Sequence, residues 1–234
     1  MKSKLLIMYN IYFFLIIGSS LLANDENSNQ KELAIHHFMQ GEFLLTQGNY
    51  ALAVLEFQDA LDIDPNASTI HISIADAYRR LGRSEHAENH LRIAIDLEPE
   101  DLSSREMLGN IYLINRKYKM AEKEFLVLSN LDTDNDNYIT ILGDLAKLQE
   151  KWIQSVDYYL KAHKINPQNY KSLENALQVC LGAELFKKAE SICLILAQSD
   201  PNNSNYWKTY KQLTAYNKNY NNTLLAISEI ERLD

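Results

Sequence analysis

The chain has 234 residues, of which 46% are hydrophobic and 10% aromatic, and these values exclude a disordered chain. Seven glycines and four prolines supply few turns, which disfavours a β-sandwich or β-barrel and favours long helices with short connections. The formal net charge of −8 argues against nucleic acid as a partner, because an acidic surface repels a phosphate backbone.

The N-terminal residues have the order of an export signal. Two lysines come first, an apolar run covers residues 5–17, and small residues lead to Ala23 before a polar stretch. This order predicts a secretory signal peptide at residues 1–23, followed by a polar linker at residues 24–33. Residues 5–23 are also long enough for an uncleaved membrane anchor, so both alternatives stay open. Either one predicts export of the remaining chain to the periplasm or envelope of a bacterium.

The four prolines mark a repeat of 34 residues. Pro65, Pro99, Pro167 and Pro201 are separated by 34, 68 and 34 residues, and Thr133 stands at the missing position. A fixed period of this length is the signature of a repeat architecture. The period predicts six units, which cover residues 34–67, 68–101, 102–135, 136–169, 170–203 and 204–234.

Small and large residues recur at fixed positions within this period. Their spacings of three and four predict two antiparallel helices of roughly 14 residues in each unit, joined by short turns. Small residues allow two helices to approach closely, as Gly41 facing Ala53 would, and each proline ends one unit. The residues that define the repeat are Gly41, Ala53, Phe57, Pro65, Tyr78, Ala87, Pro99, Gly109, Tyr112, Ala121, Phe125, Gly143, Tyr159, Pro167, Ala189 and Pro201.

These residues resemble the tetratricopeptide repeat family, whose pattern is a large residue, Leu-Gly, Tyr, then Ala, Phe, Ala and Pro. The first three units match best, and the fifth departs from the pattern at Leu177 and Cys180. The shortened sixth unit begins with Trp207 at the family's aromatic position, as expected of an atypical terminal repeat. The resemblance implies an all-α, right-handed solenoid of about six antiparallel helix pairs.

In this family the first helix of each pair lines a concave groove, and the resemblance therefore implies a binding face on these helices. The family's clamp for a peptide carboxylate is absent, because Phe38 and Glu42 replace the Lys and Asn that it needs in the first unit. Apolar members such as Phe38, Ile72 and Ile141 could equally pack against neighbouring helices. The candidate ligand-contacting residues are Phe38, Met39, Glu42, Ile72, Asp76, Arg79, Met107, Asn110, Ile141, Asp144 and Lys147.

Two pairs of residues are candidates for chemistry. His86 and His90 have a metal-ligand spacing but no identifiable third ligand, so we interpret them as part of a solvated helix face, and residues 36–37 are weaker still. Cys180 and Cys193 lie on the two facing helices of the fifth unit, where an exported chain could form a disulfide. Because both stand where other units have large buried residues, we favour free thiols in the core.

Three aspartates imitate the start of a calcium loop. Asp132, Asp134 and Asp136 alternate as such a loop requires, but the glycine and the bidentate glutamate that complete it are missing. The repeat places a turn between helix pairs here, so capping of a helix by Asp is the preferred interpretation.

The sequence has no motif of a catalytic nucleophile, phosphate loop or metalloprotease, which predicts a protein that is not an enzyme and needs no cofactor or metal. Together with the resemblance, it predicts a protein-binding scaffold of the bacterial envelope that captures a peptide or helix of a partner. The alternative is a ligand-binding subunit of an envelope transport or outer-membrane assembly system, which a closed apolar pocket would favour.

Overall fold

The computed structural model describes residues 29–233, which form helices, turns and short connections without any strand. The all-helical architecture is therefore confirmed for this part of the chain. The signal peptide or anchor expected at residues 1–23 lies outside the described residues. Within them, no helix has both the length and the apolar character needed to cross a bilayer.

The helices come in pairs, and from α2 onward their lengths alternate between 14 and 13 residues. A first helix is described over residues 29–46, so residues 29–33, expected as linker, are already helical. The first helices of two successive pairs begin at Ser68 and Leu102, 34 residues apart. Second helices begin at Tyr50 and Ser84, with the same separation. The helices that follow residues 29–46 are α2 (Tyr50–Ile63), α3 (Ser68–Arg80), α4 (Ser84–Leu97), α5 (Leu102–Ile114), α6 (Tyr118–Leu131), α7 (Asp136–Leu148), α8 (Trp152–Ile165), α9 (Tyr170–Gly182), α10 (Phe186–Ser199), α11 (Ser204–Tyr216) and α12 (Tyr220–Leu233).

One left-handed residue closes the turn inside each pair. The backbone N–H of Arg83 donates to the Tyr78 carbonyl at 2.8 Å, and that of Lys151 donates to Ala146 at 2.9 Å. Such six-to-one bonds define a Schellman motif, which needs a positive φ at the helix end. The residues with a positive φ, given in parentheses, are Gly48 (80°), Gly82 (72°), Arg116 (57°), Glu150 (59°), Glu184 (57°) and Lys218 (59°).

The connections between pairs follow the second helices. Helix α2 ends at Ile63, two residues before Pro65, and α6 ends at Leu131, two residues before Thr133. The same turn therefore forms with and without proline. Asn203 caps α11, because its side chain accepts a hydrogen bond from the Asn205 N–H at 3.2 Å.

The aspartates that resemble a calcium loop lie at one of these connections, and the expected capping by Asp is corrected there. The side chain that caps α7 is Asn135, which accepts from the Asn137 N–H at 3.2 Å. Asp132 instead accepts from the Asn135 amide at 3.1 Å, and Asp136 accepts from Asn169 at 2.6 Å. The loop is therefore a network of turn contacts.

Glycines in the first helices lie under aromatic rings of the second helices. A Cβ added at Gly41 would come within 2.5 Å of the Phe57 ring, and one at Gly143 within 2.7 Å of the Tyr159 ring. Gly109 has the same relation to Phe125, with a distance of 2.8 Å. The small residue expected opposite the glycine is also close in the fourth repeat, where the Ser155 hydroxyl donates to the Gly143 carbonyl at 2.8 Å. In each case an aromatic ring makes the close approach to the glycine. The rings of Phe57, Phe125 and Tyr159 are all fully buried.

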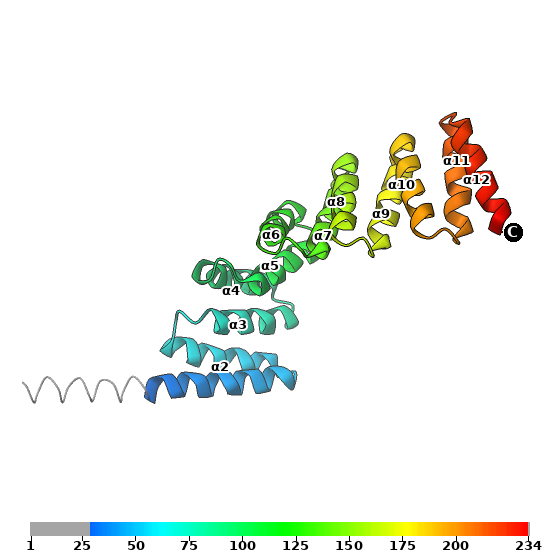
Figure 1. Ribbon diagram of the computed structural model, residues 1–234. Coiled ribbons are helices and arrows are strands. Elements are labelled where there is room, and N and C mark those ends of the chain that lie inside the picture. The colour runs from blue at the N-terminus through cyan, green and yellow to red at the C-terminus, as the bar shows by residue number, and fades with distance from the viewer. Residues whose placement is uncertain (1–28, 234) are drawn as a thin grey trace, which may run out of the picture. The chain divides into compact units, whose positions relative to one another are not determined.

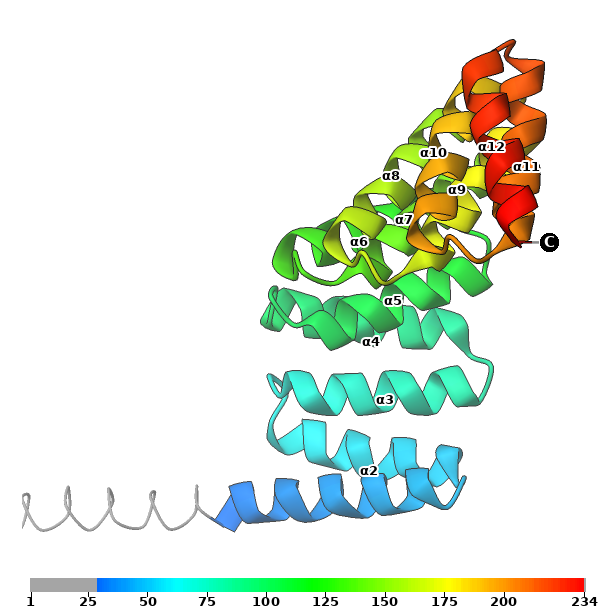
Figure 2. The ribbon, with the colours of Figure 1, turned by 45° about the vertical axis from the view of Figure 1, so that its right-hand side comes forward.

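The described residues form two compact units, which divide after Ser104, near the start of α5. In the first unit, residues 29–46, α2 and α3 are stacked in successive layers (Figure 2). In the second unit, the turns that join α7 to α8, α9 to α10 and α11 to α12 lie along one edge (Figure 1). The core of this unit includes Val156, Tyr159, Cys193 and Tyr210.

Candidate peptide-binding site

The apolar candidates of the first unit are partly accessible. Phe38 is half-buried, with its ring centre 5.9 Å from that of Phe57. Met39 is 65% exposed, and Ile72 on α3 is half-buried. These three side chains therefore combine a packing contact with a surface that a ligand could cover.

The charged candidates of the first unit are already engaged. Glu42 accepts a hydrogen bond from the Ser73 hydroxyl at 2.5 Å, and Asp76 accepts from Arg79 Nη2 at 2.5 Å and from Arg80 Nε at 2.7 Å. Burial alone would raise the pKa of Asp76, but the hydrogen bonds and charges of the two arginines outweigh it and hold this pKa below its usual value. Asp76 is thus shared by Arg79 and Arg80 within α3, and this group of three side chains keeps one net positive charge.

In the second unit, a tyrosine and a lysine meet the carboxylate of Asp144. The Tyr159 hydroxyl donates to Asp144 at 2.6 Å, and Lys147 Nζ lies 3.3 Å from the same carboxylate. Burial, assisted by Asp144, raises the pKa of Tyr159, so this hydroxyl remains protonated and a donor. The predicted positions in this unit, half-buried except for exposed Asn110, are Met107, Asn110, Ile141, Asp144 and Lys147.

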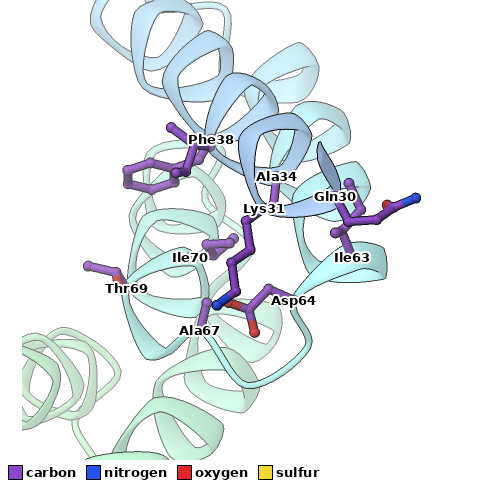
Figure 3. A pocket seen from close by; sticks show the side chains of 10 residues that line it. Gln30, Lys31, Ala34, Phe38, Ile63, Asp64, Ala67, Thr69 and Ile70 are labelled. Atoms are coloured by element: carbon purple, nitrogen blue, oxygen red, sulfur yellow. The ribbon is translucent and has the colours of Figure 1, made fainter. Parts of the chain in front are cut away.

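A cavity of about 460 Å³ opens in the first unit between residues 29–46, the end of α2 and the start of α3 (Figure 3). Phe38 is the one residue that belongs both to its wall and to the predicted groove. Sequence reasoning missed the others, since they come together only where the first helix meets α3. The cavity is lined by Gln30, Lys31, Ala34, Ile35, Phe38, Ile63, Asp64, Ala67, Thr69 and Ile70.

The cavity has an apolar wall with two charges at its rim. Ala34, Phe38 and Ile70 supply apolar surface, and the Lys31 side chain points toward the Asp64 carboxylate (Figure 3). Its volume lies in the range of about 300–1,000 Å³ that is usual for ligand pockets. The arrangement can accept an apolar side chain or small apolar molecule, with polar groups available to the backbone or head group beside it.

One of the two histidines of the second repeat differs from the expected solvated face, because His86 is exposed but His90 is half-buried. His90 Nδ1 lies 3.0 Å from Nδ1 of His71, a residue that the sequence analysis did not single out, and His71 Nε2 lies 3.4 Å from the Pro65 carbonyl. Since Nε2–H of His71 donates to that carbonyl, its Nδ1 accepts from His90. Burial, with the nearby charges of His71 and His86, lowers the pKa of His90 to about 4.

Both cysteines are free thiols buried in the second unit. The Cys193 thiol donates to the Tyr206 carbonyl at 3.3 Å. Burial raises the pKa of Cys180 to about 11 and that of Cys193 to about 12. Because the thiolate is the reactive form, neither residue is an activated nucleophile.

A tetratricopeptide repeat model matches residues 21–68 and 72–131. A protein O-mannosyl-transferase of Caenorhabditis elegans is 33% identical over 91 residues, which are 39% of this chain and 13% of that protein. Superkiller protein 3 of Schizosaccharomyces pombe is 25% identical over 167 residues, which are 70% of this chain and 12% of that protein. The chain therefore spans only a small part of the curated relatives that it matches.

Solved structures share the fold. YrrB, described as a TPR protein with an unusual peptide-binding site, has a TM-score of 0.53 at 17% identity, over 76% of this chain and 92% of its own. A tetratricopeptide repeat protein from Parabacteroides merdae has a TM-score of 0.62 at 12% identity, over 86% of this chain and 79% of its own. The family model, the paired helices and these structures together support the tetratricopeptide repeat family for this chain.

Proposed function

We propose that the chain is a non-catalytic scaffold of the bacterial cell envelope that binds an apolar segment of a partner protein on the first helices of its repeats. Tetratricopeptide repeats typically form interaction scaffolds, and a solved neighbour is described as binding peptide. The proposal for the envelope rests on the export signal expected at residues 1–23. The segment is captured first by the apolar surface of the first unit.

The observation that carries this proposal is the cavity beside accessible groove residues. Phe38 contributes to both, while Met39 beside it is 65% exposed. The neighbouring Asp76 carboxylate is held by Arg79 and Arg80, so it is not free to oppose an apolar ligand. An amphipathic helix or extended peptide with one bulky apolar side chain fits these features.

Site-specific photo-crosslinking tests the proposal. A photoreactive residue at Met39 should crosslink a partner in the envelope fraction, and a Phe38→Asp, Ile72→Asp double substitution should abolish that product. The matched control carries the photoreactive residue at Leu55, which is 56% exposed on α2. Equal products from both positions, or a product that survives the double substitution, would contradict binding on the first helices.

The cavity also favours a second candidate, a ligand-binding subunit of an envelope transport or outer-membrane assembly system. A volume of about 460 Å³ could hold a small apolar molecule without any partner protein. Native mass spectrometry of the chain purified from its envelope separates the two candidates. A bound small molecule that is lost in an Ala34→Trp variant favours the ligand-binding subunit. A chain that carries no small molecule but still crosslinks through Met39 favours the protein-binding scaffold.

A further inference from the structure

An imidazole and two carboxylates converge in the first helix pair, away from the cavity. His37 Nδ1 lies 2.8 Å from Glu56 Oε2 and 4.0 Å from Asp59 Oδ2. The three possible ligand atoms all lie within 4.8 Å of one another. Glu56 and Asp59 are three residues apart and thus share one face of α2, and His37 faces them from the preceding helix.

The equivalent positions of the next repeats show what is particular to this cluster. His71 and His90 form the corresponding contact at 3.0 Å, and Arg105 and Glu124 form it at 3.1 Å. All three pairs are separated by 19 residues, so they join the same two positions of their repeats. The contact between His37 and Glu56, taken without Asp59, is therefore a helix contact that recurs in successive repeats.

The Asp59 carboxylate is the ligand group that the equivalent pairs of the second and third repeats lack. The position of Asp59 is occupied by Ile93 in the second repeat and by Val127 in the third, where no ligand atom is available. The Asp59 side chain is 60% exposed, and that of Glu56 is 30% exposed. An ion can therefore reach the cluster from solvent, and water can complete its coordination.

The donor set selects the class of ion. Imidazole nitrogen and carboxylate oxygen are both ligands of Zn²⁺, and zinc sites with three protein ligands keep a position for water. Ca²⁺ and Mg²⁺ prefer oxygen-only sites with six or more ligands, which this cluster does not supply. The two carboxylates bring negative charge to the cluster, which favours binding of a divalent cation.

We propose that His37, Glu56 and Asp59 form a site for Zn²⁺ that joins the first helix to α2. The ion would bind His37 through Nδ1 and one oxygen of each carboxylate. It would hold together the two helices whose ends form the cavity, although the proposal does not depend on what the cavity binds. The result expected is one zinc ion per chain and a higher unfolding temperature with zinc than with magnesium.

Titration calorimetry of the full, untagged chain with ZnCl₂ tests this site. His37→Ala and Asp59→Asn should each weaken zinc binding by about tenfold or more, because loss of a ligand costs at least as much as loss of an outer-shell partner. Asp59 is the safer change for folding because its side chain is exposed. His36→Ala removes the exposed neighbouring imidazole and is the matched control, expected to bind zinc as the wild type does.

Two results would overturn the proposal. One is a wild-type chain that takes up no zinc, with MgCl₂ and ZnCl₂ giving the same unfolding temperature. The other is equal binding by the wild type, His37→Ala and Asp59→Asn. Far-ultraviolet circular dichroism of each variant establishes that lost binding is not lost folding, and if His37→Ala unfolds, the Asp59→Asn result decides.

Discussion

At the scale of single residues, the closest approach of the paired helices depends on glycine. A methyl group at Gly143 would lie 2.7 Å from the buried Tyr159 ring, so Gly143→Ala requires ring or backbone to shift. We expect the free energy of unfolding to fall by about 1–3 kcal/mol, as for other overpacked cores. Urea denaturation measures this change.

Gly182 supplies the control for this prediction. It is also helical, at the end of α9, but a methyl group there would meet no atom within 4 Å. Gly182→Ala should therefore be neutral or stabilising by up to about 1 kcal/mol, because alanine restricts the unfolded chain. If both substitutions destabilise the chain equally, the ring contact is not the cause.

The half-buried His90, which contacts the buried His71, makes stability depend on pH. The folded-state pKa of His90, about 4, lies below the unfolded value of about 6.5, so the unfolded chain binds more protons between these values. Stability should therefore be highest above pH 6.5 and fall as the pH drops toward 4. The expected loss is about 2 kcal/mol after allowance for the partial exposure of this ring.

Urea denaturation at a series of pH values, with His90→Gln beside the wild type, checks this dependence. The variant should lose most of the decrease between pH 6.5 and 4, because the glutamine does not titrate. His36→Gln alters an exposed histidine and should keep the wild-type profile. Asp76 and Glu122 have lowered pKa values, so they lose their stabilising effect at a more acidic pH. Their titration therefore does not produce the loss of stability that is expected from His90.

At the scale of elements, the turn inside each pair requires a left-handed residue, which only the first two repeats supply as glycine. Gly82 has a φ of 72° and no atom within 4 Å of an added Cβ, so its role is conformational. Gly82→Ala should cost about 1 kcal/mol. The reverse change Glu150→Gly, at a φ of 59°, should be neutral or stabilising. Thermal unfolding of both variants tests these two expectations. A lower unfolding temperature for Glu150→Gly would contradict the role given to the left-handed conformation.

The arrangement of two helices in each repeat could be predicted because the 34-residue period and the spacing of small and large residues indicate it. Pro65 and its three counterparts mark this period, although the turn at Thr133 forms without proline. The left-handed turns at Arg116 and Glu150 could not be seen, since neither residue favours that conformation. The Schellman bonds of the surrounding helix ends impose it.

The candidate site could be predicted only in part. The sequence indicated which helix face to consider, and the predicted groove positions remain predictions. It did not reveal the His71–His90 contact, because the partners lie on facing helices 19 residues apart. The cavity depends on how residues 29–46 lie against Ile63 and Ile70, which no local pattern encodes. The common 19-residue separation of the polar pairs is a signal that could have been sought once the period was known.

At the scale of the whole molecule, the helices differ in how many side chains they bury, and a helix that buries few opens at a low free-energy cost. Helix α12 has one buried residue, Ala226, whereas α10 has five. Leu224 is 66% exposed although it occupies the repeat position of Val54 and Val156, which are 6% and 0% exposed.

Hydrogen–deuterium exchange should therefore proceed fastest in α12 and slowest in the inner helices of its unit, such as α8 and α10. Opening of α12 exposes little apolar surface, so it requires only part of the free energy of global unfolding. Gly143→Ala, which weakens the packing of α7 on α8, should accelerate exchange in these two helices without changing the already rapid exchange of α12. Equal protection of α12 and α10 would show that the second unit unfolds as a single cooperative block and not pair by pair.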